Sequence, residues 1–283
     1  MIQWYPGHMA KAKREIREKL QIIDIVVELR DARIPESSSN PDLPGLIGSK
    51  SRIIVLNKAD LSDPSITQAW VNALSSSEAH AVPVEAISGK GLEDVKRLAA
   101  SVAAEISDKM IARGRRPRPA RMLVVGVPNV GKSTFINRLA GRKATRTGDR
   151  PGVTRGQQWV SVGRSLHLLD TPGLLWPKFD DQEVAIKLAV TSAVDDRLTD
   201  AEALSRWLVE FLIGHYPDAL AKYCGVERVP GDTDLVMDLI GRGRGCLQSG
   251  GRVDTRRAAE LILKDFRSGR IGQISLERPG GWS

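Results

Sequence analysis

The sequence predicts an α/β protein with a mostly parallel sheet, helices on both of its faces, and a smaller α-helical domain after it. Short apolar runs alternate with helical patterns up to about Pro177, and this alternation favours a parallel sheet covered on both faces. Beyond Pro177 the apolar periodicity is helical only. The 283 residues suffice for two domains. We therefore predict a first domain over 1–178, with an N-terminal basic segment over 1–20, and a basic helical domain over 179–283.

Each element is expected where its hydrophobic period appears. Strands should form at apolar, β-branched runs, which cover 22–29, 52–56, 81–87, 122–125, 158–162 and 166–169. Helical patterns of the first domain cover 9–20, which is basic, 92–106 and 133–139. In the second domain they cover 184–194, 201–212, 219–223, 233–240 and 255–266. The stretch 111–120 is typical of a linker, because it holds four arginines, a glycine and two prolines.

The charge distribution points to a polyanionic partner. The formal net charge is +8. Residues 109–148 hold 11 basic residues and no acidic one, and residues 241–283 hold nine basic and four acidic ones. Clustered positive charge of this kind indicates RNA or a phosphate-rich ligand.

Other features exclude several classes of protein. Two cysteines cannot form a disulfide framework or a four-ligand zinc site. The sequence has neither an apolar run of membrane-spanning length nor an N-terminal targeting pattern, so we expect a cytoplasmic protein with no membrane partner. We also expect a monomer, because no sustained apolar heptad occurs.

A phosphate-binding loop is predicted where a strand leads into a helix. Residues 126–133 read GVPNVGKS and match the pattern GxxxxGK[ST] in this context. The glycines let backbone N–H groups surround phosphate oxygens, and the helix N-terminus adds positive potential. Lys132 is expected to reach the β- and γ-phosphates, and the Ser133 hydroxyl to ligate Mg²⁺. The predicted binding residues of this loop are Asn129, Val130, Gly131, Lys132, Ser133 and Thr134.

Two later segments are expected to complete the phosphate site. Asp170 opens the sequence DTPG at the end of a predicted strand, where it would hold Mg²⁺ through water. The Gly173 N–H would contact the γ-phosphate. Thr154 is the expected switch threonine, whose hydroxyl and carbonyl would meet Mg²⁺ and the γ-phosphate, with Thr147 as the competing candidate.

A guanine-binding segment is predicted at 57–60, which read NKAD after the strand 52–56. Asp60 can accept hydrogen bonds from guanine N1–H and N2–H₂, and adenine offers neither donor, so the motif disfavours ATP. Lys58 would pack its stem over the base, and Asn57 would tie this loop to the phosphate loop.

The segment 85–91 reads EAISGKG and corresponds to a base-contacting loop of the SAxxGxG type. The backbone of Ala86 would contact guanine O6 there. Glu85 takes the place of the usual serine, so this loop departs from the pattern.

The motifs run in an unusual order. Common small GTPases carry the phosphate loop first, then DxxG, then NKxD, whereas here NKAD and EAISGKG come before the phosphate loop and DTPG. The site depends on where loops lie at the carboxyl ends of parallel strands, not on chain order. Circular permutation therefore preserves such a site, and 111–120 would join the original chain ends.

These motifs, together with WYPGHM at 4–9, DARIP at 31–35, NP at 40–41 and the tail 254–276, resemble the circularly permuted ribosome biogenesis GTPase A family over essentially the whole chain. The resemblance implies a P-loop GTPase that binds GTP and GDP with Mg²⁺. It further implies action in late maturation of the large ribosomal subunit, with hydrolysis stimulated by the subunit. The basic C-terminal domain would contact rRNA.

The resemblance also implies how hydrolysis is performed. Many GTPases carry, directly after DxxG, a glutamine that orients the attacking water, but Leu174 stands there and cannot polarise water. The resemblance points to His8 as the replacement, since an imidazole can accept a hydrogen bond from water. It also implies that Asn129 helps to bind K⁺. The predicted catalytic residues are His8, Lys132, Thr154 and Gly173.

Four alternatives stay open from the sequence. His8 can be an ordinary residue of an N-terminal loop. The protein can be a GTPase that acts on another RNA or RNA–protein client, or a GTP-dependent binding scaffold with negligible catalysis, which Leu174 favours and His8 opposes. A P-loop ATPase or kinase is the remaining alternative, and Asp60 argues against it.

Overall fold

The computed structural model describes residues 17–76, 79–141, 158–163, 165–170 and 181–282, and within them the chain forms two compact units. The first unit contains the described residues up to 170 together with 275–282, and the second is Asp181–Ile274. The helical domain predicted over 179–283 therefore extends too far at its C-terminal end. Of the predicted basic helix 9–20, the structure describes only 17–20, which are helical.

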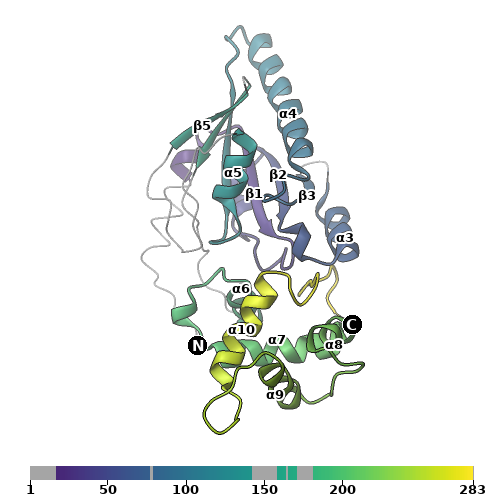
Figure 1. Ribbon diagram of the computed structural model, residues 1–283. Coiled ribbons are helices and arrows are strands. Elements are labelled where there is room, and N and C mark those ends of the chain that lie inside the picture. The colour runs from purple at the N-terminus through teal and green to yellow at the C-terminus, as the bar shows by residue number, and fades with distance from the viewer. Residues whose placement is uncertain (1–16, 77–78, 142–157, 164, 171–180, 283) are drawn as a thin grey trace. The chain divides into compact units, whose positions relative to one another are not determined.

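A six-stranded sheet forms the first unit (Figure 1). Its strands are β1 (Ile25–Asp31), β2 (Ser51–Asn57), β3 (Ala79–Val84), β4 (Ala120–Gly126), β5 (Gln158–Val162) and β6 (Leu166–Asp170). They lie in the order β3-β2-β1-β4-β6-β5, and every neighbouring pair is parallel except β5 with β6. The mostly parallel sheet is thus confirmed. All seven residues of β1 are buried, as expected for a central strand covered on both faces.

The helical elements between these strands are α2 (Leu43–Ile47), the 3₁₀ turn η1 (Ala59–Leu61), α3 (Pro64–Leu74), α4 (Leu92–Ala112) and α5 (Lys132–Ala140). Of these, α3, α4 and α5 pack against the sheet. α3 begins after Asp63, whose carboxylate accepts hydrogen bonds from two N–H groups of the first turn, at 2.8 and 3.2 Å. It covers the face that carries Ile54 and Leu56, where Trp70 is buried with them. α4 and α5 contact each other as well as the sheet.

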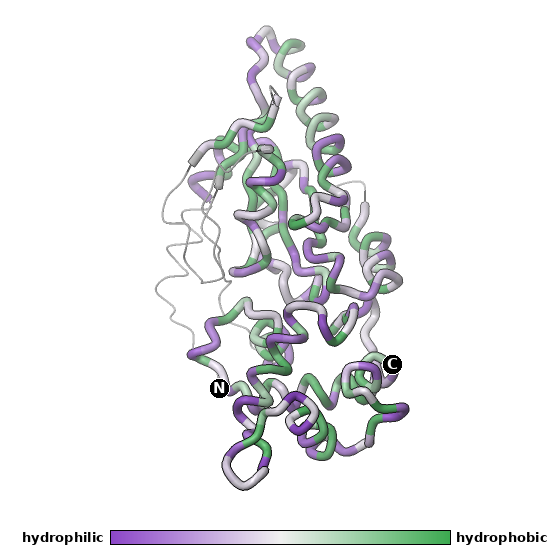
Figure 2. The backbone as a smooth tube through the Cα atoms, viewed as in Figure 1, coloured by the Kyte–Doolittle hydropathy of each residue, from purple (hydrophilic) through white to green (hydrophobic). Residues whose placement is uncertain are grey.

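The second unit is helical, as expected. Its elements are α6 (Gln182–Val190), η2 (Asp196–Leu198), α7 (Ala201–His215), α8 (Pro217–Cys224), α9 (Thr233–Gly243) and α10 (Thr255–Arg267). An aspartate caps the start of most of them through hydrogen bonds to first-turn N–H groups, namely Asp181, Asp195, Asp200, Asp232 and Asp254. Along these helices hydrophobic and hydrophilic stretches alternate (Figure 2), as expected of helices with one buried face. None of the described helices is long and apolar enough to cross a bilayer.

The last described residues, 275–282, return to the first unit and hold the loop that follows β1. Leu276 donates its N–H to the Arg33 carbonyl at 2.8 Å. The Glu277 carboxylate accepts from the N–H groups of Glu36, at 2.8 Å, and Ser37, at 3.2 Å, and from the Ser37 hydroxyl. The Trp70 indole donates to the Glu277 carbonyl at 3.2 Å. These bonds explain why the tail belongs to the sheet unit and not to the helical one.

Candidate nucleotide-binding site

The parallel strands bring five chain segments to one edge of the sheet. β2 and β4 flank β1, β3 lies beside β2, and β6 lies beside β4, all running in the same direction. The residues that follow these strands therefore share the carboxyl edge, which is where ligands bind in open α/β sheets. NKAD, EAISGKG and the phosphate loop begin there, and so does the DTPG segment.

The phosphate loop runs from β4 into α5, and two of its positions require glycine. A Cβ at Gly126 would lie 2.6 Å from the Leu29 carbonyl oxygen of the neighbouring strand. Gly131 has φ +97°, and a Cβ there would lie 2.5 Å from Asn57 Nδ2. Asn129 also adopts a positive φ, of 56°. The close contacts at both glycines and the positive φ of Gly131 thus exclude a larger residue at either position.

Lys132 lies at the first position of α5, and its side chain folds back over the loop. Its Nζ donates to the carbonyl oxygens of Gly126 and Val127, at 3.1 and 2.9 Å. The side chain is buried. An ammonium group held against the carbonyl groups of the loop, next to a helix N-terminus, provides the positive charge that phosphate oxygens require. Ser133 and Thr134 follow in the first turn of the helix.

Asn57 joins three loops at this edge. Its Nδ2 donates to the Val130 carbonyl at 2.7 Å, and its Oδ1 accepts from the Ala86 N–H at 3.1 Å. The side chain is 2% exposed. The tie between NKAD and the phosphate loop is the one that the sequence predicts. The second bond shows in addition that Asn57 holds the EAISGKG loop, so one amide sets the spacing between the base side and the phosphate side.

Lys58 is positioned by a carboxylate to which the sequence analysis assigned no role. Its Nζ lies 3.0 Å from Asp31 Oδ2 at the end of β1, and its backbone adopts a left-handed φ of 61°. The buried Asp31 also binds the Arg33 guanidinium through two bonds of 2.9 and 2.8 Å. Burial alone would raise the pKa of Asp31, but the charges of Arg33 and Lys58 and the hydrogen bonds outweigh it and hold the pKa far below its ordinary value. Asp60 follows within η1 and is exposed.

The Glu85 carboxylate, which stands where a serine is usual, folds its loop back on itself. It accepts from the Ser88 hydroxyl at 2.9 Å and pairs with Lys90 at 3.0 Å. The hydrogen bonds from Lys90 and Ser88 lower the pKa of Glu85 below its ordinary value. The Ala86 N–H already donates to Asn57, so the contact predicted between this N–H and guanine O6 would compete with that bond. Arg138 of α5 donates to the Ile87 carbonyl in the same loop.

Several predicted residues lie outside the part of the chain that the structure describes. These are His8, Thr147, Thr154, Gly173 and Leu174. Asp170 is the last residue of β6, and only its backbone is described. Because Leu169 pairs with Leu123 of β4, the Asp170 backbone lies at the same edge as the phosphate loop.

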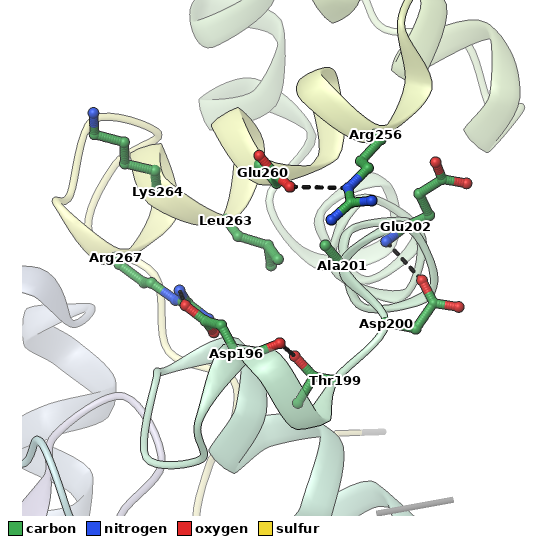
Figure 3. A pocket seen from close by; sticks show the side chains of 10 residues that line it. All are labelled: Asp196, Thr199, Asp200, Ala201, Glu202, Arg256, Glu260, Leu263, Lys264 and Arg267. Atoms are coloured by element: carbon green, nitrogen blue, oxygen red, sulfur yellow. Dashed lines mark hydrogen bonds and ion pairs between the residues drawn. The ribbon is translucent and has the colours of Figure 1, made fainter. Parts of the chain in front are cut away.

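A cavity of about 670 Å³ lies within the second unit between α10, η2 and the start of α7 (Figure 3). Four acidic side chains line it, so it is not a simple phosphate pocket. Arg267 pairs with Asp196 at 2.8 Å and also donates to the Val190 carbonyl, and Arg256 pairs with Glu260 at 3.2 Å. The basic groups of the cavity are therefore largely engaged with acids of the same unit.

The loops gathered at the carboxyl edge, with Asn57 between them, define a P-loop GTPase in which the guanine motif comes before the phosphate loop. Residues 121–209 match the family described as 50S ribosome-binding GTPase. The protein called ribosome biogenesis GTPase A is 47% identical in Priestia megaterium, covering 98% of this chain and 97% of that one. In Thermotoga maritima it is 34% identical, covering 98% and 95%.

This chain belongs to the ribosome biogenesis GTPase A family. A solved structure agrees: the GNP-bound YlqF from T. maritima superposes with a TM-score of 0.67 at 28% identity, covering 96% of this chain and all of that one. A GDP-bound form of the same protein gives 0.68. The family predicted from the motifs is confirmed, and with it the GTPase activity and the binding of GTP and GDP.

Proposed function

We propose that this GTPase acts in late maturation of the large ribosomal subunit and that the subunit stimulates its GTP hydrolysis. The relatives that cover nearly the whole chain are named ribosome biogenesis GTPase A, which supports a ribosomal particle as the partner. The observation that carries the catalytic part is the Asn57 tether, because it holds guanine-reading and phosphate-reading loops together in one site. We further propose that the protein works as a monomer in the cytoplasm.

The nucleotide would be held from both ends. Asp60 would accept from guanine N1–H and N2–H₂, while Lys58, held by Asp31, would cover the base. Lys132 would exchange its two carbonyl partners for β- and γ-phosphate oxygens. The N–H groups of the loop and of the first turn of α5 would bind the remaining phosphate oxygens.

The oxygen ligands at the phosphate end suit Mg²⁺. The Ser133 hydroxyl, at the start of α5, would bind it directly, together with Thr154, and Asp170 would hold it through water. A bound Mg²⁺ neutralises charge on the phosphates. Asn129, which lies on the phosphate loop with a positive φ, would help to bind K⁺.

We propose that His8 orients the attacking water, while Lys132, Thr154 and the Gly173 N–H bind the γ-phosphate. Leu174 follows DTPG and offers no polar group for this task. His8 would reach the γ-phosphate only when the ribosomal particle orders the N-terminal segment. The test is His8→Ala, which should keep GDP binding and subunit binding but lose the stimulated turnover. Unchanged stimulated turnover in this variant would reject the assignment.

The second unit would contact rRNA. Arg257 lies exposed at the start of α10, and within the described residues it has no side-chain ion pair, whereas the neighbouring Arg256 pairs with Glu260. Of the two arginines that follow Thr255, Arg257 is therefore the better candidate for a phosphate contact.

The proposed function is tested by measuring GTP hydrolysis with and without purified large ribosomal subunits, at fixed K⁺ and Mg²⁺. Isolated small subunits are the control. A large stimulation by the large subunit alone is expected. Binding of GTP without any stimulation would favour a scaffold, and stimulation by another RNA instead would indicate a different client.

A further inference from the structure

The linker that joins the permuted halves forms an arm that projects beyond the sheet. Along α4 the buried residues are Leu92, Val95, Ala99 and Ala103. The helix continues to Ala112, so its last nine residues have no buried side chain and extend about 13 Å at 1.5 Å per residue. Figure 1 shows this end of α4 and the returning segment passing beyond the strands.

The arm is an ordered structure at both ends. At its tip, the N–H groups of Arg113 and Arg115 donate to the Met110 carbonyl at 3.1 and 2.9 Å, and Gly114 adopts φ 67°. This arrangement closes the helix end in the manner of a glycine C-cap. At its base, Arg118 forms two bonds with Asp24, of 2.6 and 3.0 Å, just before β1. The tip is therefore presented in a defined place.

The arm carries positive charge that the rest of the described fold does not neutralise. Residues 109–118, which we call the basic arm, contain five basic residues and no acidic one, and all five are exposed. Arg118 is engaged with Asp24. Among the described residues, no hydrogen bond or ion pair involves the side chains of the other four, Lys109, Arg113, Arg115 and Arg116.

The same helix shows that this pattern is specific to the arm. Nearer its start, Lys96 pairs with Glu93 at 2.7 Å and Arg97 pairs with Asp94 at 2.6 Å. A surface evolved only for solubility interleaves both signs of charge in this way. The arm instead concentrates guanidinium groups, which bind phosphate oxygens through two parallel hydrogen bonds.

We propose that the basic arm binds the phosphate backbone of RNA and gives the GTPase unit an RNA contact of its own. α4 leaves the EAISGKG loop at the carboxyl edge and runs back to the start of β4, so the arm lies at the sheet edge opposite the nucleotide. The segment 113–118 reads RGRRPR and has no aliphatic or aromatic side chain to insert into a membrane, and Ile111 is the one exposed large hydrophobic residue of the basic arm. Figure 2 shows the returning segment as hydrophilic. The inference rests on the proposed ribosomal function only for the source of the RNA.

The test compares two double variants of the full-length protein on the same helix-and-arm surface. Arg113→Gln with Arg116→Gln removes two charges that have no acidic partner, and Lys96→Gln with Arg97→Gln removes two that have one. Binding to purified large subunits and to a short RNA duplex of arbitrary sequence is measured over a series of salt concentrations. Thermal unfolding and basal GTP hydrolysis check that both variants keep the fold.

The arm variant should bind the RNA duplex more weakly and with a shallower salt dependence. Each lost phosphate contact removes about 0.9 from the slope of log K against log salt, which is about eightfold in affinity at 0.1 M salt. The Lys96/Arg97 variant should bind nearly as the unchanged protein does. Its basal GTP hydrolysis, and that of the arm variant, should stay unchanged.

The outcomes separate this inference from the proposed function. If the unchanged protein binds large subunits and the arm variant binds both probes with the same affinity and slope, the arm inference is wrong and the function stands. If the unchanged protein does not bind large subunits but binds duplex RNA through the arm, the arm inference stands and the proposed ribosomal function is rejected. Arm-dependent binding to phosphatidylserine vesicles without binding to RNA would overturn the inference in favour of a membrane.

Discussion

Replacing Asn57 with alanine removes the amide that joins the base side of the nucleotide site to its phosphate side. The variant loses the bond to the Val130 carbonyl, of 2.7 Å, and the bond from the Ala86 N–H, of 3.1 Å. Both partners lose their hydrogen bond at a position where the asparagine itself is 2% exposed. A variant of this kind tests whether one side chain sets the spacing of the site.

The expected magnitude follows from these two groups. Each buried polar group left without a partner costs about 1–3 kcal/mol, so the two cost about 2–6 kcal/mol. In the nucleotide-free variant the loops can separate and admit water, which lowers the cost. A bound nucleotide forces them together again, so the cost appears in binding. Even about 2 kcal/mol corresponds to roughly 30-fold weaker binding of GDP.

The assay is equilibrium binding of a fluorescent GDP analogue, with thermal unfolding of each variant recorded in parallel. Asn72→Ala is the matched control, because Asn72 is exposed on α3 and its side chain accepts a bond from Gln68 on the same helix. The control should bind GDP as the unchanged protein does. If a folded Asn57→Ala variant binds GDP as tightly as the control, the tether does not set the site and the reasoning is refuted.

Three further variants test the surrounding contacts. Asp60→Asn removes two charge-assisted hydrogen bonds to guanine, so GDP binding should weaken about 100-fold or more while xanthosine diphosphate gains; unchanged preference for GDP would contradict the guanine assignment. Asp31→Asn removes the carboxylate that pairs with the buried Arg33 and should lower the free energy of unfolding by about 3–5 kcal/mol in urea. Because the pKa of Asp31 is lowered in the folded state, its stabilisation is present above the unfolded pKa of about 4 and is lost as the pH falls below it. The stability of Asp31→Asn should therefore depend less on pH in that acidic range, and an equal slope would refute the linkage. Glu277→Gln weakens the bonds to Glu36 and Ser37, so amide hydrogen exchange should accelerate over 33–40 but not in the helical unit; equal exchange in both would argue against the clamp.

The sheet of the GTPase unit is predictable from sequence because each strand is a distinct apolar run. The strand predicted over 158–162 lies at β5, and the one over 166–169 ends one residue short of β6. β1 was harder to delimit. Its prediction over 22–29 begins too early, because residues 21 and 22 form a turn in which the Ile22 N–H donates to the Lys19 carbonyl, and it ends two residues short of Asp31. Apolar residues in a turn resemble the start of a strand when only the local pattern is visible.

Long-range polar contacts could not be predicted in this way. Glu277 is buried against Ser37, which lies 240 residues earlier in the chain. No local sequence pattern distinguishes it from an exposed glutamate. The role of Asp31 likewise depends on a distant residue, because Lys58, which directly follows the neighbouring strand β2, forms an ion pair with it. A charged residue at the end of a fully buried strand is the signal that could have pointed to it, since such charges are buried only when paired.

The tail at 275–282 also affects the order in which the protein can be completed during its own synthesis. A ribosome releases the N-terminal strands first, and domains generally fold as they emerge. Here the loop that carries Arg33 and follows Asp31 forms its hydrogen bonds with Glu277, a residue translated 241 positions after Glu36. The Lys58 side of the site would therefore gain this support only after the whole helical unit, Asp181–Ile274, has been translated. A chain that ends before Ser275 would carry every nucleotide motif but lack the bonds from Leu276 and Glu277. Such nascent fragments would therefore bind GTP more weakly than the full chain.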